Sequence, residues 1–295
     1  MIDYSSLMKS IESRKSIRGY GPGEISEDIL NKIKEFIKVI PCISTKKVTL
    51  KMINSSLLSR HLLNPLGSFL LNAPYFLAVI AEEDDSFLEE SGFQSEYLVL
   101  YLTALGLGTC YIGLFINLLT LAQELEVPKG KRLVIVSPIG FAQVDFISLM
   151  TNTILKSGLA LTTGTKRKEV EEFTFYKEWG NSSRDYLNDN PLLKQIFSFV
   201  RLSPSGANIQ PWRFILSDEK IYCFAHDISK ENPLLNENLW GMDFSRFDAG
   251  IAMCHFDIAA KGLGYKGGWQ IPSGDNDKKE QGNSKSGNRL VGIWE

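Results

Sequence analysis

Hydrophobic residues recur with helical spacing in two stretches that lie far apart in the chain. Residues 29–41 and 192–204 match at an offset of 163, with apolar residues in common at Leu30/Leu193, Ile33/Ile196, Phe36/Phe199 and Ile37/Val200. Each stretch has one apolar face and runs into a proline, at Pro41 or Pro204. Because proline cannot continue a helix, the pattern predicts two amphipathic helices that end at these prolines.

A second pair of helices is predicted further along the chain. Residues 94–108 and 250–264 are both rich in apolar residues and both close with Gly-Leu-Gly, at an offset of 156. Glycine in this position is a common helix stop. Two matches in the same order predict two related halves. We place them at 1–160 and 161–295, with the connection near 150–175.

Between the helices, runs of apolar and β-branched residues predict strands. They lie at 75–81, 132–137, 212–217 and 220–225, and the last residues, 290–294, are compatible with a final strand. The polar segment 273–289 is rich in Gly, Ser, Asn and Lys and predicts an exposed loop. Strands and helices within each half predict an α+β fold built around mixed β-sheets.

Composition narrows the class of protein without naming a reaction. The chain has 295 residues, of which 44% are hydrophobic, so it can bury a large core. Its 32 Lys and Arg residues nearly balance its 34 Asp and Glu residues, so charge gives no support for nucleic-acid binding. Two uncharged stretches, 62–81 and 97–123, are interrupted by Pro, Gly and Asn, which favours core elements over membrane spans.

Cysteine and histidine spacing argues against a metal site. The four cysteines lie far apart with no Cys-x-x-Cys pair, and the three histidines do not cluster. The chain begins without the basic and apolar regions of a secretory signal. We therefore expect a cytoplasmic protein with free thiols. His255, Cys110 and Cys254 lie in apolar stretches and are expected to be packed in the core.

The first candidate site is Arg14-Lys15-Ser16-Ile17-Arg18, which follows a short predicted helix at 4–12. In an extended segment, residues 14, 16 and 18 point the same way. Two guanidinium groups and a hydroxyl on one side suit a phosphate group. The alternative is a solvated surface patch.

The second candidate site is the segment 204–212, Pro-Ser-Gly-Ala-Asn-Ile-Gln-Pro-Trp, between a predicted helix and a predicted strand. Small residues let its backbone approach a flat ligand, and the amides of Asn208 and Gln210 can bind a polar edge. The alternative is an ordinary turn, although such a turn seldom needs Ser, Asn and Gln together.

These motifs, with a later Gly-Leu-Gly-Thr-Cys at 106–110, resemble the nitroreductase-like FMN-dependent oxidoreductases over nearly the whole chain. The resemblance implies a nitroreductase-like fold and a flavin site shared by two subunits of a homodimer. One subunit would supply Arg-x-Ser-x-Arg to the phosphate and ribityl chain. The other would supply Pro-Ser-x-x-Asn to the isoalloxazine ring.

This sequence departs from the family pattern, because the two motifs lie about 190 residues apart, in different halves. The first half's own loop, 41–47, has lost Asn, Gln and Pro-Trp, and no Arg-x-Ser-x-Arg occurs around 179–186. One intact site therefore combines the two halves, and the opposite site combines two degenerate pieces. We predict an internal pseudo-dimer with one FMN per chain, which can act as a monomer.

The resemblance adds contacts by position. In the family, a basic residue or two near the end of the subunit core also binds the FMN phosphate; here Arg167 is preferred, with Lys166 and Lys168 as alternatives. The turn after residue 110 would bring a backbone N–H to the flavin N5. The full predicted cofactor site comprises Arg14, Lys15, Ser16, Arg18, Gly113, Leu114, Arg167, Pro204, Ser205, Gly206, Asn208 and Gln210.

The resemblance also implies the reaction. NAD(P)H would reduce the flavin by hydride transfer and leave, and a small acceptor such as a nitroaromatic or a quinone would then bind, in ping-pong order. The cofactor carries the hydride, so no catalytic side chain is expected. Two alternatives stay open because fold does not decide reaction. One is a flavin-binding or sensing protein without turnover; the other is an FMN-fragmenting or dehalogenating relative.

Overall fold

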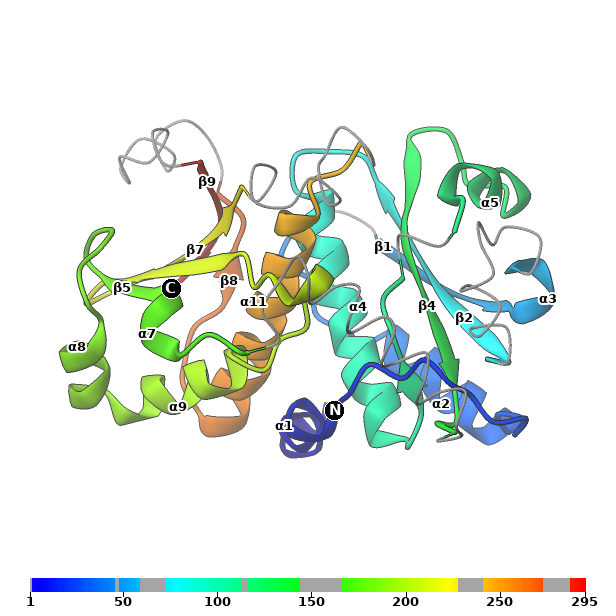
Figure 1. Ribbon diagram of the computed structural model, residues 1–295, viewed down its shortest axis with the longest axis horizontal. Coiled ribbons are helices and arrows are strands. Elements are labelled where there is room, and N and C mark those ends of the chain that lie inside the picture. Colours follow the sequence, from blue (N-terminus) through cyan, green and yellow to red (C-terminus); the bar gives the residue numbers. More distant parts are fainter. Residues whose placement is uncertain are drawn as a thin grey trace.

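The computed structural model describes residues 2–45, 48–58, 73–112, 116–143, 166–227, 241–272 and 287–295. Two β-sheets lie on either side of a central pair of long helices, α4 (Phe87–Ala104) and α11 (Phe244–Leu263) (Figure 1). The first sheet belongs to the first half of the sequence and the second sheet to the second half, which confirms the predicted α+β class.

The two sheets share one strand order. The first is β1 (Val48–Asn54), β2 (Tyr75–Glu82), β4 (Lys131–Gly140) and β3 (Gly108–Thr109), all antiparallel. In the second, β6 (Trp212–Leu216), β7 (Ile221–His226), β9 (Asn288–Trp294) and β8 (Trp269–Gln270) pair antiparallel in the corresponding order. One parallel strand, β5 (Thr174–Tyr176), is added beside β6. The repeated order is what two related halves predict.

The strands at 75–81, 132–137, 212–217, 220–225 and 290–294 are all present, within a few residues of the predicted bounds. Of the loop predicted at 273–289, residues 273–286 lie outside the described part of the chain. Residues 288 and 289 correct that prediction, because they pair with β7 as the start of β9. Residues 150–165 of the connection predicted at 150–175 also lie outside the described part of the chain. The boundary between the halves at 160 stays a prediction.

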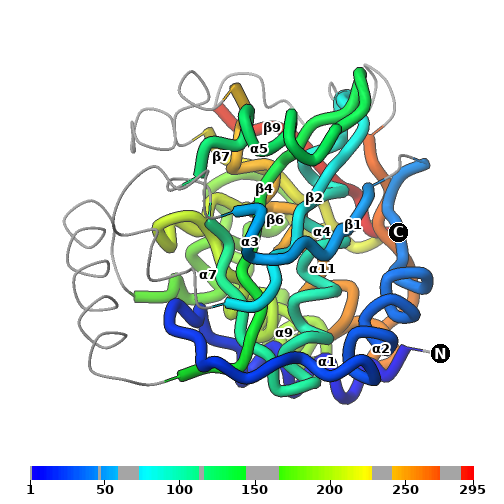
Figure 2. Tube along the Cα trace, turned by 90° about the vertical axis from the view of Figure 1, so that its right-hand side faces the viewer, coloured from blue at the N-terminus to red at the C-terminus, as the bar shows by residue number. Residues whose placement is uncertain are grey.

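Shorter helices complete the fold: α1 (Tyr4–Ser13), α2 (Glu27–Ile37), α3 (Ser55–Leu58), α5 (Leu118–Glu124), α7 (Val170–Phe173), α8 (Arg184–Asp189), α9 (Pro191–Val200) and the 3-10 turn η3 (Gly206–Asn208). The predicted ends of α2 and α9 are wrong by several residues, since both helices stop before their prolines. A proline disfavours the helical conformation of the residue before it, and here each helix ends a few residues earlier than that. Helices α1, α2 and α9 lie along the lower side of the molecule in both views (Figure 1, Figure 2).

Helices α4 and α11 approach each other through a reciprocal pair of glycines. A Cβ on Gly92 would lie 2.0 Å from the carbonyl oxygen of Phe247, and a Cβ on Gly250 would lie 2.2 Å from that of Glu89. Both members of one contact are shifted by 158 residues from the corresponding members of the other. Reciprocal contacts of this kind are typical of a two-fold interface. The two halves therefore meet like two subunits of a dimer.

The ends of the two long helices give the same offset and correct the sequence alignment. After α4, Gly106 has φ +80° and Leu107 N–H donates to Leu102; after α11, Gly264 has φ +76° and Tyr265 N–H donates to Ala260. Both are left-handed glycine caps. The true offset is thus 158 rather than 156, and the two Gly-Leu-Gly segments are not equivalent, because 262–263 still belong to α11.

Strand β2 forms the end of the first long apolar run, 62–81, of which residues 62–72 lie outside the described part of the chain. Leu77 and Val79 face the main core around α4, while Phe76 and Ala78 face a second apolar cluster that includes Leu121 of α5. A strand buried on both faces is apolar throughout. Among the helices that the structure describes, none has the length and apolar character needed to cross a membrane.

Candidate functional site

The segment 14–18, which follows α1, runs in extended conformation alongside β3. Ser16 forms a parallel bridge with Thr109, and the backbone N–H of Ile17 donates to the carbonyl oxygen of Thr109 at 2.9 Å. Gly108 permits this approach, because a Cβ there would lie 2.6 Å from Cγ1 of Ile17. The predicted extended backbone is therefore present, and its side chains alternate between two sides.

Arg14 points inward from this segment, whereas the neighbouring Lys15 is exposed. The Arg14 side chain is 8% exposed, and its Nε lies 4.0 Å from Oε1 of Glu96 in α4. This Nε is buried and makes no hydrogen bond to any residue that the structure describes. A buried donor without a partner is costly. The orphaned N–H marks a place where an acceptor, such as a phosphate oxygen, would be stabilised.

Arg167 reaches the same place from the connection between the halves. Its guanidinium donates to the carbonyl oxygen of Ser203, directly before the loop 204–212. Burial lowers the pKa of Arg167 to about 10, with smaller contributions from the charges of Arg14 and Arg201, while Glu96 opposes the shift. The charge of Arg14 thus acts on Arg167, so the two cations share one region of the site. The structure thus brings together two predicted phosphate ligands, Arg14 from the motif 14–18 and Arg167 from the connection between the halves.

Of the three basic residues considered at this position, only Arg167 is placed beside Arg14 by a described interaction. Lys166 is exposed, and the Nζ of Lys168 donates to the carbonyl oxygen of Gln210 at 3.1 Å. The choice of Arg167 over its neighbours therefore has geometric support.

The loop 204–212 has an unusual backbone. Ala207, Asn208 and Gln210 have φ of +49°, +58° and +55°, a left-handed conformation that costs non-glycine residues about 1–3 kcal/mol each. The N–H of Gly206 donates to Oδ2 of Asp248 in α11 at 3.0 Å. The surroundings therefore hold this loop in a shape that its own residues do not favour, as is common at ligand sites.

Gln210 fastens the loop to the segment that carries Arg167. Its Oε1 accepts from the backbone N–H of Lys168 at 2.9 Å, and its Nε2 donates to the carbonyl oxygen of Lys166 at 3.2 Å. Its own backbone N–H donates to Oγ of Ser205 at 2.9 Å. The Gln210 amide is thus occupied within the protein, so Gln210 shapes the site. Asn208 donates to Lys166 as well, at 3.4 Å, from a partly exposed position.

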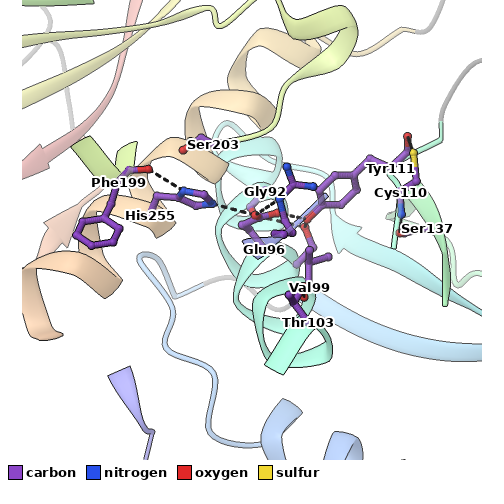
Figure 3. A network of polar contacts seen from close by, with 12 residues as sticks. Gly92, Glu96, Val99, Thr103, Cys110, Tyr111, Ser137, Phe199, Ser203 and His255 are labelled. Carbon is purple, nitrogen blue, oxygen red and sulfur yellow. Dashed lines mark hydrogen bonds and ion pairs between the residues drawn. The ribbon is translucent and has the colours of Figure 1, made fainter. Parts of the chain in front are cut away.

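A buried polar network joins the central helices α4 and α11 (Figure 3). Oε1 of Glu96 lies 2.9 Å from Nε2 of His255, whose Nδ1 lies 3.1 Å from the carbonyl oxygen of Phe199. Oε2 of Glu96 accepts from the hydroxyl of Tyr111 at 3.0 Å, and Tyr111 contacts Ser95 at 3.1 Å. His255 is buried, as predicted, but it belongs to this polar network.

The sequence reasoning missed Glu96 altogether. It lies on the helix predicted at 94–108, where the apolar residues around it determined the interpretation. The available signal was the single acidic residue in that apolar helix, because a buried position seldom tolerates a carboxylate without partners. Burial raises the pKa of Tyr111 well above its usual range, and the neighbouring Glu96 charge adds to this.

The opposite loop, 41–45, is anchored in the corresponding way. The N–H of Ile43 donates to both carboxylate oxygens of Glu90 in α4 at 3.2 Å. Ile43 lies 163 residues before Gly206, and Glu90 lies 158 residues before Asp248, so the anchor is the same contact in each half. The loop that lost the Asn and Gln of the motif has kept its attachment.

Beside this first-half loop lies a cavity of about 540 Å³. It is lined by the exposed thiol of Cys42 and by uncharged neighbours, which are Ile43, Ser44, Thr45, Ser86, Trp269, Gln270, Ile271 and Pro272. Within the described chain, the arginine pair of the intact site has no counterpart among these residues. The two sites therefore differ in charge as well as in loop sequence.

Of the remaining residues of the predicted cofactor site, the structure describes some and leaves out others. Arg18 is partly buried near Tyr20, and its charge opposes the rise in the Tyr20 pKa that burial causes. Gly113 and Leu114 lie outside the described residues, so their role stays a prediction. The thiols of Cys110 and Cys254 are buried, as expected, and no cluster of metal-binding side chains occurs in the described ranges.

The fold is that of the nitroreductases. A solved structure titled "putative nitroreductase" from Thermotoga maritima aligns with a TM-score of 0.59 and 19% identity, covering 100% of this chain and 95% of that one. The chain belongs to the family described as "Putative TM nitroreductase", whose model matches residues 6–260.

Two further solved structures match about half of this chain. An "FMN-dependent nitroreductase" from Clostridium difficile is 24% identical, covers 46% of this chain and 87% of its own, and has a TM-score of 0.42. A "nitroreductase with bound FMN" from Bacteroides fragilis is 18% identical, covers 46% and 88%, and has a TM-score of 0.39. Among curated proteins, none matches this chain.

Proposed function

We propose that the protein is an FMN-dependent oxidoreductase that uses NAD(P)H to reduce a small acceptor, such as a nitroaromatic or a quinone. One FMN would bind between the two halves. The observation that carries this proposal is the buried, unpartnered Nε of Arg14 beside Arg167, at the edge of the loop 204–212. Membership of the nitroreductase family supports the reaction class.

The arginine pair fits the phosphate of FMN. Two guanidinium groups held close together repel each other, and that repulsion contributes to the lowered pKa of Arg167. A phosphate monoester carries about −1.5 to −2 charges at pH 7 and several strong acceptors, so it relieves the repulsion and also supplies the missing partner for Arg14. Ser16 and Arg18 follow on the same extended segment and would extend this contact along the phosphate and ribityl chain.

The loop 204–212 fits the flavin ring. Asn208 is partly exposed on this loop and would be accessible to the ring. Gln210 and Asp248 hold the loop in place through hydrogen bonds to Lys168 and Gly206. A rigid loop of this kind orients a flat ring without a large ordering cost on binding. When bound, FMN supplies the hydride-accepting and hydride-donating chemistry, and the protein orients it and tunes its electrostatics.

One composite site per chain follows from the pseudo-dimer. The intact site draws Arg14 from the first half and the loop 204–212 from the second, and the two halves meet across α4 and α11. A single chain therefore contains every predicted ligand of one FMN. The opposite position combines the altered loop 41–45 with a segment that has no Arg-x-Ser-x-Arg. The protein would not need to form a homodimer to complete its site.

The test is to count FMN per chain and then to measure turnover. Purified protein is reconstituted with FMN, freed of excess cofactor and heated, and the released flavin is quantified by absorbance. About one FMN per chain and steady-state oxidation of NADH or NADPH with a quinone or nitroaromatic acceptor are expected. Two FMN per chain would overturn the single-site model. FMN binding without NAD(P)H oxidation would instead indicate a flavin-binding or sensing protein.

A further inference from the structure

Glu96 is a buried carboxylate that the proposed hydride chemistry does not use. It is fully enclosed on α4, yet its two oxygens face groups from three other parts of the chain. These are Arg14 after α1, Tyr111 after β3 and His255 in α11. A buried charge is expensive unless it is paired and hydrogen-bonded, so its placement calls for a reason.

The hydrogen bonds of His255 indicate how many protons the Glu96–His255 pair carries. Nδ1 faces the carbonyl oxygen of Phe199, which can only accept, so Nδ1 carries a hydrogen. Nε2 lies 2.9 Å from Oε1 of Glu96, and this contact also needs a proton, whichever atom owns it. The Glu96–His255 pair therefore holds one shared proton and has no net charge. It leaves the charges of Arg14 and Arg167 available for an anion.

The geometry gives Glu96 a second role, which is to hold Arg14 in place. Oε1 of Glu96 lies 4.0 Å from Nε of Arg14, within the range of an ion pair, and the Glu96 charge also acts on Arg167. Tyr111 and His255 fix the carboxylate from the other sides. The arginine side chain is thus pre-positioned before any ligand arrives, which lowers the ordering cost of binding.

The second half of the protein offers a comparison for the role of Glu96. At the offset of 158 that relates the two central helices, Glu96 corresponds to Cys254 on α11, and His255 corresponds to Tyr97 on α4. Cys254 is a buried thiol close enough to Tyr97 to affect its pKa. The half without an Arg-x-Ser-x-Arg motif therefore has no carboxylate at this position. The carboxylate is present only where there are arginines to hold.

We propose that Glu96 is a positioning residue, which holds Arg14 in place for the phosphate of FMN. This inference rests on the proposed FMN site. It predicts a specific signature: loss of Glu96 should weaken the binding of the phosphate and leave the binding of the flavin ring nearly unchanged. A carboxylate that only stabilised the packing of α4 on α11 would affect both equally.

The experiment compares FMN with riboflavin, which has the same ring and no phosphate. Flavin-free full-length protein is titrated with each compound, and binding is followed by the change in flavin fluorescence. Wild-type protein should bind FMN more tightly. In Glu96→Ala, the affinity for FMN should fall about 10-fold, because the Arg14 side chain must then be ordered on binding, while that for riboflavin changes less than about 3-fold. The FMN affinity of Glu96→Gln should lie between that of the wild type and that of Glu96→Ala.

Two control variants separate positioning from packing. Cys254→Ala changes the pseudo-symmetric counterpart of Glu96, and Tyr97→Phe removes a buried hydrogen bond to Asp257 across the same two helices. Both should keep the wild-type ratio of FMN to riboflavin affinity. A thermal melt of each variant shows that it is folded; if Glu96→Ala is not, Glu96→Gln decides.

The outcomes distinguish the two proposals. If the wild-type protein binds neither flavin, the proposed function is wrong, and the role of Glu96 falls with it. If the wild-type protein prefers FMN and a folded Glu96 variant keeps the full preference, the positioning role is overturned and the FMN site stands. Equal losses for FMN and riboflavin, or the same loss in Tyr97→Phe, also overturn the positioning role, because they identify a packing effect.

Discussion

The loop 204–210 and the loop 41–45 occupy corresponding positions in the two halves, and each donates a backbone N–H to an acidic residue of its own central helix. What differs is what the loops contain. The second-half loop has Asn208 and Gln210 in left-handed conformations and is tied to the segment beside Arg167, whereas the first-half loop lines an uncharged cavity. The attachment is common to both halves, while the predicted ligand-binding groups of the loop occur in the second half alone.

The comparison extends to the central helices. The two glycines, the two left-handed caps and the two acidic anchors repeat at one offset, because they determine how the halves pack. The Glu96 and Cys254 positions do not repeat, because only one of them faces an arginine pair. Features that repeat in both halves determine their packing, and the features that differ lie at the predicted cofactor site.

The largest effect is expected at the helix contact that the halves share. Gly92→Ala and Gly250→Ala each place a Cβ within 2.0 or 2.2 Å of a carbonyl oxygen of the facing helix, so the helices must separate. Overpacking against backbone should lower the free energy of unfolding by about 3 kcal/mol or more in each case. Urea denaturation followed by circular dichroism measures this.

A matched control for this pair is Gly268→Ala, since a Cβ at Gly268 would meet no atom within 4 Å. It should change stability little. If one of the two helix glycines tolerates alanine as well as Gly268 does, the two contacts are not equivalent in energy. The view of the α4–α11 contact as a two-fold interface would then need correction.

A smaller effect, on binding, should separate the intact site from the altered one. Arg14→Ala should reduce FMN affinity by about 1.5–3 kcal/mol, or roughly 10- to 100-fold, because it removes a charged donor to the phosphate. Asn208→Ala should weaken binding too or shift the flavin potential. Thr45→Ala and Arg184→Ala, in the altered copies of the two motifs, should have little effect. Equilibrium titration with FMN measures all four, and a larger loss at Thr45 or Arg184 would contradict the one-site model.

The overall fold was largely predictable, because amphipathic helices and buried strands have clear periodicities. The main helices and the strands at 75–81, 132–137, 212–217 and 220–225 follow directly from those patterns. The strand β1 was missed because its two buried residues, Leu50 and Ile53, face different apolar clusters and break a simple alternation. The two-residue strands β3 and β8 are too short to produce a pattern. The helix ends were wrong because the prolines lie beyond the last helical turns.

The site was predictable in its ligand types and less so in its supporting residues. Arg14 and Arg167 could be named by motif and position, but the burial of Arg14 Nε is a property of the folded chain. Left-handed φ at Ala207, Asn208 and Gln210 is set by tertiary contacts and has no signature in residue type. Glu96 was missed because a partner 159 residues away, His255, makes its burial tolerable.

The smallest effect concerns the two acidic anchors, and it should appear as a pH dependence. Burial raises the pKa of Asp248 well above its usual 3.8, against the hydrogen bond from Gly206, and burial also raises the pKa of Glu90, against bonds from Ser44 and Gln94. A carboxyl with a raised pKa binds its proton more tightly in the folded state than in the unfolded chain. Its contribution to stability is therefore present at low pH and is lost as pH rises through the folded-state pKa.

Asp248→Asn and Glu90→Gln remove this titration but keep an oxygen that can accept the loop N–H. Relative to wild type, each variant should become more stable as pH rises from 5 to 8, and Asp248→Asn should change more, since its pKa is raised further. Urea denaturation at both pH values measures the difference. A stability difference that does not change with pH would mean that the two carboxyls stay ionised in the folded state, which would contradict the raised pKa of both groups.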